Sequence, residues 1–213
     1  MSVSTLEHHS EHEHHGVELS PEQQVKANRF GLWLFFISEI FLFGALLVAR
    51  FFLWGGTRPE LNQTIGFVAT TILLISSFFV YRGETAIEHG DNDRFKNNFL
   101  LAALFGLLFF VGVVVLEWNI FGLEGEIAGM EIFGQLRPAD GVFGGVFFAM
   151  TGMHALHVLS GVFLLLAAWF NGRKNRFSAD DNWGVEGIAL YWHYVDVVWV
   201  FFYPALYLIG KTV

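Results

Sequence analysis

Residues 142–170 read VFGGVFFAMTGMHALHVLSGVFLLLAAWF, a run of 29 residues without Asp, Glu, Lys or Arg. At about 1.5 Å per residue, a straight helix of this length measures about 43 Å. The hydrocarbon core of a bilayer is only roughly 30 Å thick. The run therefore predicts a membrane-spanning helix that tilts or extends beyond the hydrocarbon on one side.

Four more apolar runs of about 20 residues or more occur in the chain. They cover residues 30–54, 61–81, 98–120 and 187–209, and short segments rich in Gly, Asn, Asp and charge separate them. A membrane β-barrel would instead show alternating segments of about 10 residues. The sequence thus predicts an all-α integral membrane protein, a five-transmembrane-helix bundle over residues 29–213 that follows a polar, His- and Glu-rich tail over residues 1–28.

The composition supports a membrane protein and excludes several other classes. Hydrophobic residues make up 54% of the chain and charged residues 15%, whereas a soluble domain has about 25% charged residues. The formal net charge of −8 speaks against a nucleic-acid partner. The absence of Cys excludes a disulfide framework and thiolate metal sites. We expect no cleavable signal peptide, because the chain opens on a polar stretch.

The basic residues favour one orientation in the membrane. If the N-terminus is cytoplasmic, the outer side holds four of the twelve Lys and Arg residues, namely Arg50, Arg58, Arg137 and Lys211. The inner side then holds the other eight, which are Lys26, Arg29, Arg82, Arg94, Lys96, Arg173, Lys174 and Arg176. Because cytoplasmic loops are enriched in Lys and Arg, we expect the N-terminus inside and the C-terminus outside.

The tail carries a cluster of histidines interleaved with glutamates: His8, His9, His12, His14 and His15. Such a stretch either binds a divalent metal weakly or is simply solvated. Ser20 followed by Pro21 is typical of a helix start, with Ser as the cap and Pro in the first turn.

Five ionisable side chains can occupy the middle portion of the predicted bundle, where each costs at least about 2.5 kcal/mol on insertion scales. They are Glu39, His154, His157, His193 and Asp196. We hypothesise that they form one buried hydrogen-bonded cluster between the helices, which acts either in proton transfer or purely in structure. Three-residue spacing places the two histidines of the fourth run on one helix face. Two histidines alone do not make a catalytic metal site, so we expect neither a catalytic residue nor a metal in this chain.

Three further features concern helix ends and packing. Glu117 lies beside Trp118 at the outer end of the third run, which we interpret as an interfacial position. Pro204 lacks a backbone donor and is expected to kink the last helix near its outer end. Gly141, Gly145 and Ala149 form a stripe of small residues that would let a neighbouring backbone approach closely.

Three segments, in the same order along the chain, resemble one known family. The segments TGMHALHVLSG (residues 151–161) and GVEGIALYWHYVDVVWVFFYPALYLIG (residues 184–210) resemble the last two helices of subunit III of haem-copper oxidases. The segment GLWLFFISEIFLFGA (residues 31–45) resembles the Glu-bearing helix of that family. The likeness extends over residues 29–210. Longer family members have seven spans, so this chain resembles the five-span bacterial form.

The resemblance implies an accessory subunit of a proton-pumping terminal oxidase in the bacterial inner membrane. In that family, subunit III packs against the catalytic subunit I, stabilises it during turnover, binds phospholipid and supports proton uptake. Subunits I and II and membrane phospholipids are therefore the expected partners. Haem and copper are expected in the partner subunits and not in this chain.

Individual positions carry over to this sequence. By resemblance, Glu39 matches the family's intramembrane Glu, and His154 and His157 match its paired histidines. Glu186, His193, Asp196 and Trp199 match its final-helix motif. The family's basic lipid ligand aligns with Asn171, so Arg173 or Lys174 would substitute for it. The lipid-binding residues implied in this way are Arg173, Lys174, Glu186 and Trp199.

Alternative functions remain open from the sequence alone. Within the family, the chain could be subunit III of a quinol oxidase or a homologue associated with nitric oxide reductase. From a different class, it could be an independent proton or ion transporter, although the paired broken helices of many transporters are not visible.

Overall fold

The computed structural model describes residues 20–127, 130–131, 133–179 and 181–213. In this part of the chain, five helices are long and apolar enough to cross a membrane, which confirms the predicted five-helix fold class. They are α1 (Pro21–Trp54), α2 (Gln63–Glu88), α3 (Asn92–Gly112), α4 (Gly141–Arg173) and α5 (Trp183–Tyr203). A π-helical turn extends α3 over Val113–Glu117 (η1), and another extends α5 over Pro204–Leu208 (η2).

Local sequence explains where the helices begin. Ser20 and Gln23 form a reciprocal capping box at the start of α1, and Pro21 occupies its first turn. This confirms the expected helix start, and it makes residues 21–28 the first turns of α1 itself. The side chain of Asn62 caps α2 by accepting hydrogen bonds from two backbone N–H groups, and Asp91 caps α3 in a similar way.

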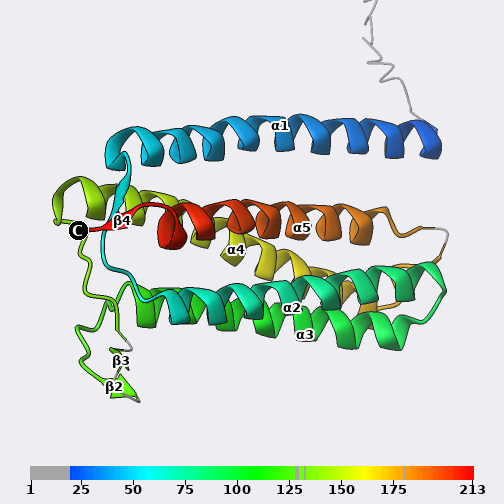
Figure 1. Ribbon diagram of the computed structural model, residues 1–213. Coiled ribbons are helices and arrows are strands. Elements are labelled where there is room, and N and C mark those ends of the chain that lie inside the picture. Colours follow the sequence, from blue (N-terminus) through cyan, green and yellow to red (C-terminus); the bar gives the residue numbers. More distant parts are fainter. Residues whose placement is uncertain (1–19, 128–129, 132, 180) are drawn as a thin grey trace, which may run out of the picture.

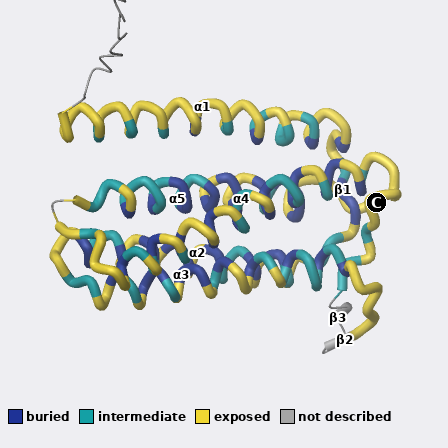
Figure 2. The backbone as a smooth tube through the Cα atoms, turned by 180° about the vertical axis from the view of Figure 1, so that it is seen from behind, coloured by how far each residue is buried: buried dark blue, intermediate teal, exposed yellow. Residues whose placement is uncertain are grey.

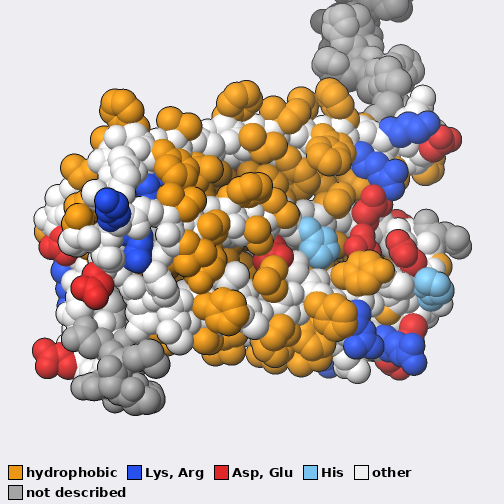
Figure 3. All heavy atoms as spheres, viewed as in Figure 1, with side chains coloured by type: hydrophobic (Ala, Val, Ile, Leu, Met, Phe, Trp, Pro, Cys, Tyr) orange, Lys and Arg blue, Asp and Glu red, His pale blue; other side chains and the backbone are white. Residues whose placement is uncertain are grey.

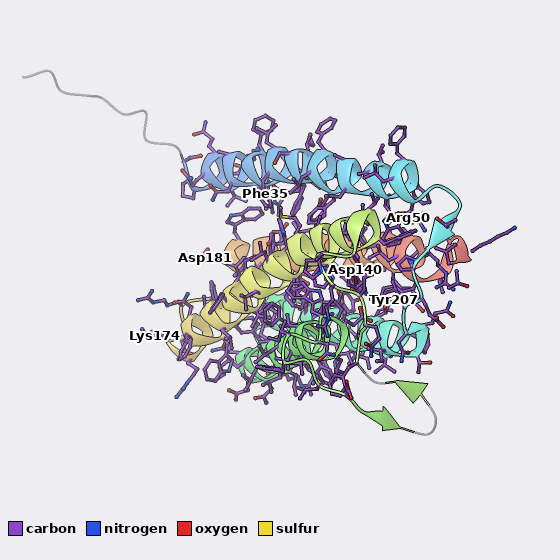
Figure 4. The ribbon with its side chains drawn as sticks, turned by 90° about the vertical axis from the view of Figure 1, so that its left-hand side faces the viewer. Phe35, Arg50, Asp140, Lys174, Asp181 and Tyr207 are labelled. Carbon is purple, nitrogen blue, oxygen red and sulfur yellow. The ribbon has the colours of Figure 1, made fainter. Side chains whose placement is uncertain are left out.

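The helices form three groups across the molecule (Figure 1). Helix α1 lies along one side, α4 and α5 form the middle, and α2 and α3 pair on the other side. Figure 4 shows α4 running obliquely to α1. In Figure 2, α1 is exposed along most of its length. Its buried residues are Phe36, Phe43, Arg50 and Trp54, which recur at intervals of seven or four and define one narrow contact face.

Short strands lie at the end of the bundle that holds the C-terminus (Figure 1). Strand β1 (Thr57–Arg58) pairs in parallel with β4 (Lys211–Thr212), and β2 (Glu126–Ile127) pairs antiparallel with β3 (Met130–Glu131). The β1–β4 pair ties the end of α1 to the C-terminal segment. Helix α1 begins at the opposite end of the bundle, as five consecutive crossings require.

Glycines allow the closest packing, but not where we expected it. Trp192 of α5 is buried between Gly106 of α3 and Gly161 of α4, and a Cβ added at Gly161 would lie 2.7 Å from the Trp192 ring. At Gly145, in contrast, an added Cβ would meet no described atom within 4 Å. The expected stripe of small residues instead borders an apolar groove of about 300 Å³ between α1 and α4. Within the described residues, no neighbouring backbone fills it.

Candidate functional site: polar residues inside the bundle

A contact between a carboxyl group and an imidazole joins α1 to α4. Oε2 of Glu39 lies 3.1 Å from Nε2 of His157, and each side chain is only 15% exposed. Phe43, one turn after Glu39 on α1, packs its ring against the His157 ring with centroids 4.8 Å apart. The Glu39–His157 pair is therefore shielded on its α1 side by an aromatic ring.

The hydrogen-bond pattern fixes how many protons this pair holds. Nδ1 of His157 lies 2.8 Å from the backbone carbonyl oxygen of Met153. A carbonyl oxygen can only accept, so Nδ1 carries a hydrogen. Nε2 then either accepts from a protonated Glu39 or, as part of an imidazolium, donates to an ionised Glu39. In both arrangements one hydrogen lies between the two side chains.

Helix α5 supports the same region through Tyr191. The Tyr191 hydroxyl lies 2.6 Å from Oγ of Ser160 and 3.3 Å from the carbonyl oxygen of His157. Tyr194, on the same helix, stacks on Phe36 of α1 with ring centroids 4.9 Å apart. These contacts fix α4, and with it His157, relative to α1 and α5.

His154 occupies a different environment. It is 1% exposed, and its ring stacks on Trp199 with centroids 4.8 Å apart and meets the edge of Phe109. Neither ring nitrogen forms a hydrogen bond to a described residue. His154 thus lies in an aromatic core, although it is only one helical turn from His157.

His193 and Asp196 lie in a third place, the seam between α2 and α5. Nδ1 of His193 lies 2.8 Å from Oγ of Ser77 on α2. Asp196 lies one turn further along α5 and is 8% exposed. The Trp199 indole N–H donates to Oγ1 of Thr70 on α2 over 2.9 Å. The five residues hypothesised to form one hydrogen-bonded cluster therefore lie in three places, and the direct contact among them is that of Glu39 with His157.

The residues expected to bind lipid are also divided. Arg173 and Lys174 are exposed at the end of α4, and the Arg173 guanidinium lies over the Trp169 ring at 5.1 Å. Glu186, at the start of α5, forms an ion pair with Arg29 of α1 at 2.8 Å. Trp199, at 1% exposure, is a core residue, because its ring stacks on His154. Its buried position removes it from the surfaces that lipid can reach.

Two polar residues have environments that the sequence analysis missed. The interfacial interpretation of Glu117 is wrong: Glu117 is 7% exposed, and its carboxylate accepts a hydrogen bond from the Tyr207 hydroxyl. Both residues lie on the π-helical turns η1 and η2. Pro204 was the sequence signal for this arrangement, because the last helix widens to a π turn that begins at that proline.

Arg50 is likewise buried, at 0% exposure, near the C-terminal end of α1. Its guanidinium donates to the carbonyl oxygens of Ala205 and Ile209, which belong to the η2 region, and Figure 4 shows it between α1 and the end of α5. Sequence analysis treated Arg50 only as an outer-side charge. Its real partners are backbone carbonyl groups at the ends of α1 and of the last helix, where carbonyls lack helical donors.

Within the described residues, no group of three or more His, Asp or Glu side chains is placed to hold a metal ion. The tail histidines His8, His9, His12, His14 and His15 lie outside the described residues. The candidate site described above consists of ionisable and hydrogen-bonding side chains.

Comparisons with known proteins agree with the resemblance. The family model described as cytochrome c oxidase subunit III matches residues 8–211. A cytochrome c oxidase subunit 3 from Synechocystis sp. is 33% identical over 207 residues, which cover 93% of this chain and 79% of that protein.

Two further relatives carry the same name. The one from Thermostichus vulcanus is 32% identical over 85% of this chain and 87% of its own length. The one from Rattus norvegicus is 28% identical over 87% of this chain and 71% of its own length. Five spans, an intramembrane Glu–His pair and a match over almost the whole chain lead to one conclusion. The chain belongs to the cytochrome c oxidase subunit III family and is an accessory subunit III of a haem-copper oxidase, an oxygen-reducing, proton-pumping complex.

Proposed function

We propose that this chain is the five-helix subunit III of a cytochrome c-fed oxidase in a bacterial inner membrane, with its N-terminus in the cytoplasm. It packs against subunit I, beside subunit II, and those partners hold the haem and copper. It stabilises subunit I through repeated turnover and supports proton uptake. The names of the relatives, all cytochrome c oxidase subunit 3, support cytochrome c over quinol as the donor.

The Glu39–His157 contact is the observation that carries this proposal. An accessory subunit without redox centres needs few ionisable groups inside the membrane, where each one is costly. This pair nevertheless holds one transferable proton between α1 and α4, with both side chains mostly buried. A role in proton transfer would explain why two costly ionisable side chains are present at this position. Two apolar side chains would suffice if the position served helix packing alone.

The test distinguishes a role of the titratable proton of Glu39 from a role of the hydrogen bond between Glu39 and His157. In Glu39→Gln, the amide can still donate to Nε2 of His157, but the titratable proton is lost. We expect the purified oxidase to assemble normally with this variant, to take up fewer protons per electron, and to lose activity faster over successive turnovers. Oxygen uptake is measured with reduced cytochrome c and, separately, with quinol, which also identifies the donor.

Glu117→Gln is the matched control, because it changes a buried carboxyl that is not part of the pair. We expect it to keep the wild-type proton uptake per electron. If Glu39→Gln matches the wild type in assembly, stability and proton-coupled activity, the pair has no role in proton uptake and the proposal loses its support.

We extend the proposal to phospholipid at the inner end of the bundle. Arg173 and Lys174 are exposed beside the interfacial ring of Trp169, so a lipid phosphate can reach both. Glu186 contributes indirectly by holding Arg29. Trp199, from inside the core, supports the helix on which Glu186 lies. The phospholipid content of the purified oxidase should fall when both basic residues are replaced by Gln.

A further inference from the structure

The seam between α2 and α5 contains a polar side chain at the surface of the chain. His193 is half-buried, and its Nδ1 is engaged by Ser77. Its other nitrogen, Nε2, forms no hydrogen bond to a described residue. Buried polar atoms without a partner do occur in this chain, but Nε2 of His193 is not one of them. Nε2 therefore reaches the surface. Figure 3 shows that the face carrying α5 and α2 is largely hydrophobic and that histidine and acidic side chains interrupt it.

The depth of His193 excludes the usual partners of a surface histidine. The last span runs from Trp183 to Leu208. At about 1.5 Å per residue, His193 lies about 15 Å from the inner end of that helix, near the middle of the membrane. Neither water nor a lipid headgroup reaches this depth, and acyl chains offer no hydrogen bond.

The surroundings of His193 form an apolar surface. Val197 and Val200 lie one and two turns further along the same face of α5, and they are 51% and 46% exposed. Across the seam on α2, Leu74 is 46% and Tyr81 is 59% exposed. Beneath this surface, Oδ1 of Asp196 also lacks a hydrogen-bond partner among the described residues. The face is thus apolar with a polar group at its centre.

We propose that the α2–α5 face docks a membrane-spanning helix of a partner oxidase subunit, and that this helix presents a hydrogen-bonding side chain to Nε2 of His193. An intramembrane polar group is stable when it faces protein, and a polar side chain on a neighbouring helix is the partner that this depth allows. The inference rests on the proposed assembly with oxidase subunits, but the two can fail separately.

Site-specific crosslinking in the intact oxidase tests the docking face. A photoreactive p-benzoylphenylalanine is placed at Val197, at Leu74, or at the control position Leu104. Leu104 is 54% exposed at a similar depth on α3. We expect adducts between this chain and a larger membrane subunit from the first two positions and not from the third.

The other outcomes would contradict either the docking face or the proposed function. Equal adducts from all three positions, adducts with lipid alone, or a product of twice the chain mass would overturn the docking face. If no other subunit purifies with the chain under conditions that preserve membrane complexes, the proposed function fails before the docking face is tested.

Two variants distinguish the proposed contact of Nε2 with a partner helix from the internal hydrogen bond between Nδ1 and Ser77. His193→Phe removes Nε2, whereas Ser77→Ala removes the internal hydrogen bond to Nδ1 of His193 together with the hydrogen bond between Ser77 and Asp196. We expect His193→Phe to reduce the amount of partner subunit retained per chain after detergent purification by about threefold to tenfold. Ser77→Ala should retain the wild-type amount. Equal losses from both variants would assign His193 to the folding of this chain and overturn the proposed contact.

Discussion

The carboxyl group of Glu117 is buried near the end of the bundle that holds the C-terminus, and Tyr207 is its hydrogen-bond donor. Tyr207→Phe keeps the ring but leaves a buried acceptor without its donor. A buried polar group left unsatisfied costs about 1–3 kcal/mol. We expect this loss in the free energy of unfolding, measured as a lower thermal midpoint of the purified protein in detergent.

Tyr203→Phe is the control for this prediction. Tyr203 lies one turn earlier and stacks on Tyr207 with ring centroids 5.4 Å apart, but it makes no contact with Glu117 that would depend on its hydroxyl. Its loss should change stability by less than about 0.5 kcal/mol. Equal effects from both variants would show that ring packing, and not the hydrogen bond, stabilises this end.

At the level of residues, the sequence predicted which side chains lie in the membrane but not their partners. Hydropathy and spacing placed Glu39, His154 and His157 correctly inside spans. Helical periodicity assigns a side chain only to a broad face, however, and one turn was enough to direct His157 to α1 and His154 into an aromatic core. Glu117 was misjudged because a π turn shifts the register of the helix, and hydropathy carries no sign of that shift.

Helix packing predicts that Gly161→Ala and Gly145→Ala, both on α4, affect stability differently. In Gly161→Ala, the new Cβ would lie 2.7 Å from the buried Trp192 ring. Overpacking of this kind typically costs about 1–3 kcal/mol. In Gly145→Ala, no described atom lies within 4 Å of the new Cβ, and Ala is favoured over Gly in a helix by about 1 kcal/mol.

We therefore expect Gly161→Ala to lower the thermal midpoint of the isolated chain in detergent and Gly145→Ala to leave it unchanged or raise it. The opposite order would mean that the stripe at Gly145, and not the contact at Trp192, sets the distance between helices.

The positions of the helices were predictable, whereas their full lengths were not. Hydropathy detects contact with lipid, so it located the apolar part of each span. The helices continue through polar residues such as Lys26 and Arg29 because their hydrogen bonds and caps do not require lipid. The stripe at Gly145 was visible as a pattern, but the sequence could not show which helix, if any, would cover it.

At the scale of the whole molecule, five crossings place the two ends of the chain on opposite sides of the membrane. The distribution of basic residues, eight against four, predicts which side is which. Lys174 and Lys211 are exposed at opposite ends of the bundle, and the chain contains no Cys. Single Lys174→Cys and Lys211→Cys variants therefore each carry one thiol at a known end of the bundle.

A membrane-impermeant maleimide then reports the orientation in cells. We expect Lys174→Cys to react only in inside-out vesicles and Lys211→Cys only from the outer surface of intact cells. Lys174→Cys lowers the inner count of basic residues from eight to seven, still above the outer four, so the substitution does not remove the bias that it tests. If the two labelling patterns were exchanged, the Glu39–His157 contact would be unaffected. The exposed ends of Arg173 and Lys174 would then lie outside, and the lipid site proposed there would have to recruit the outer leaflet.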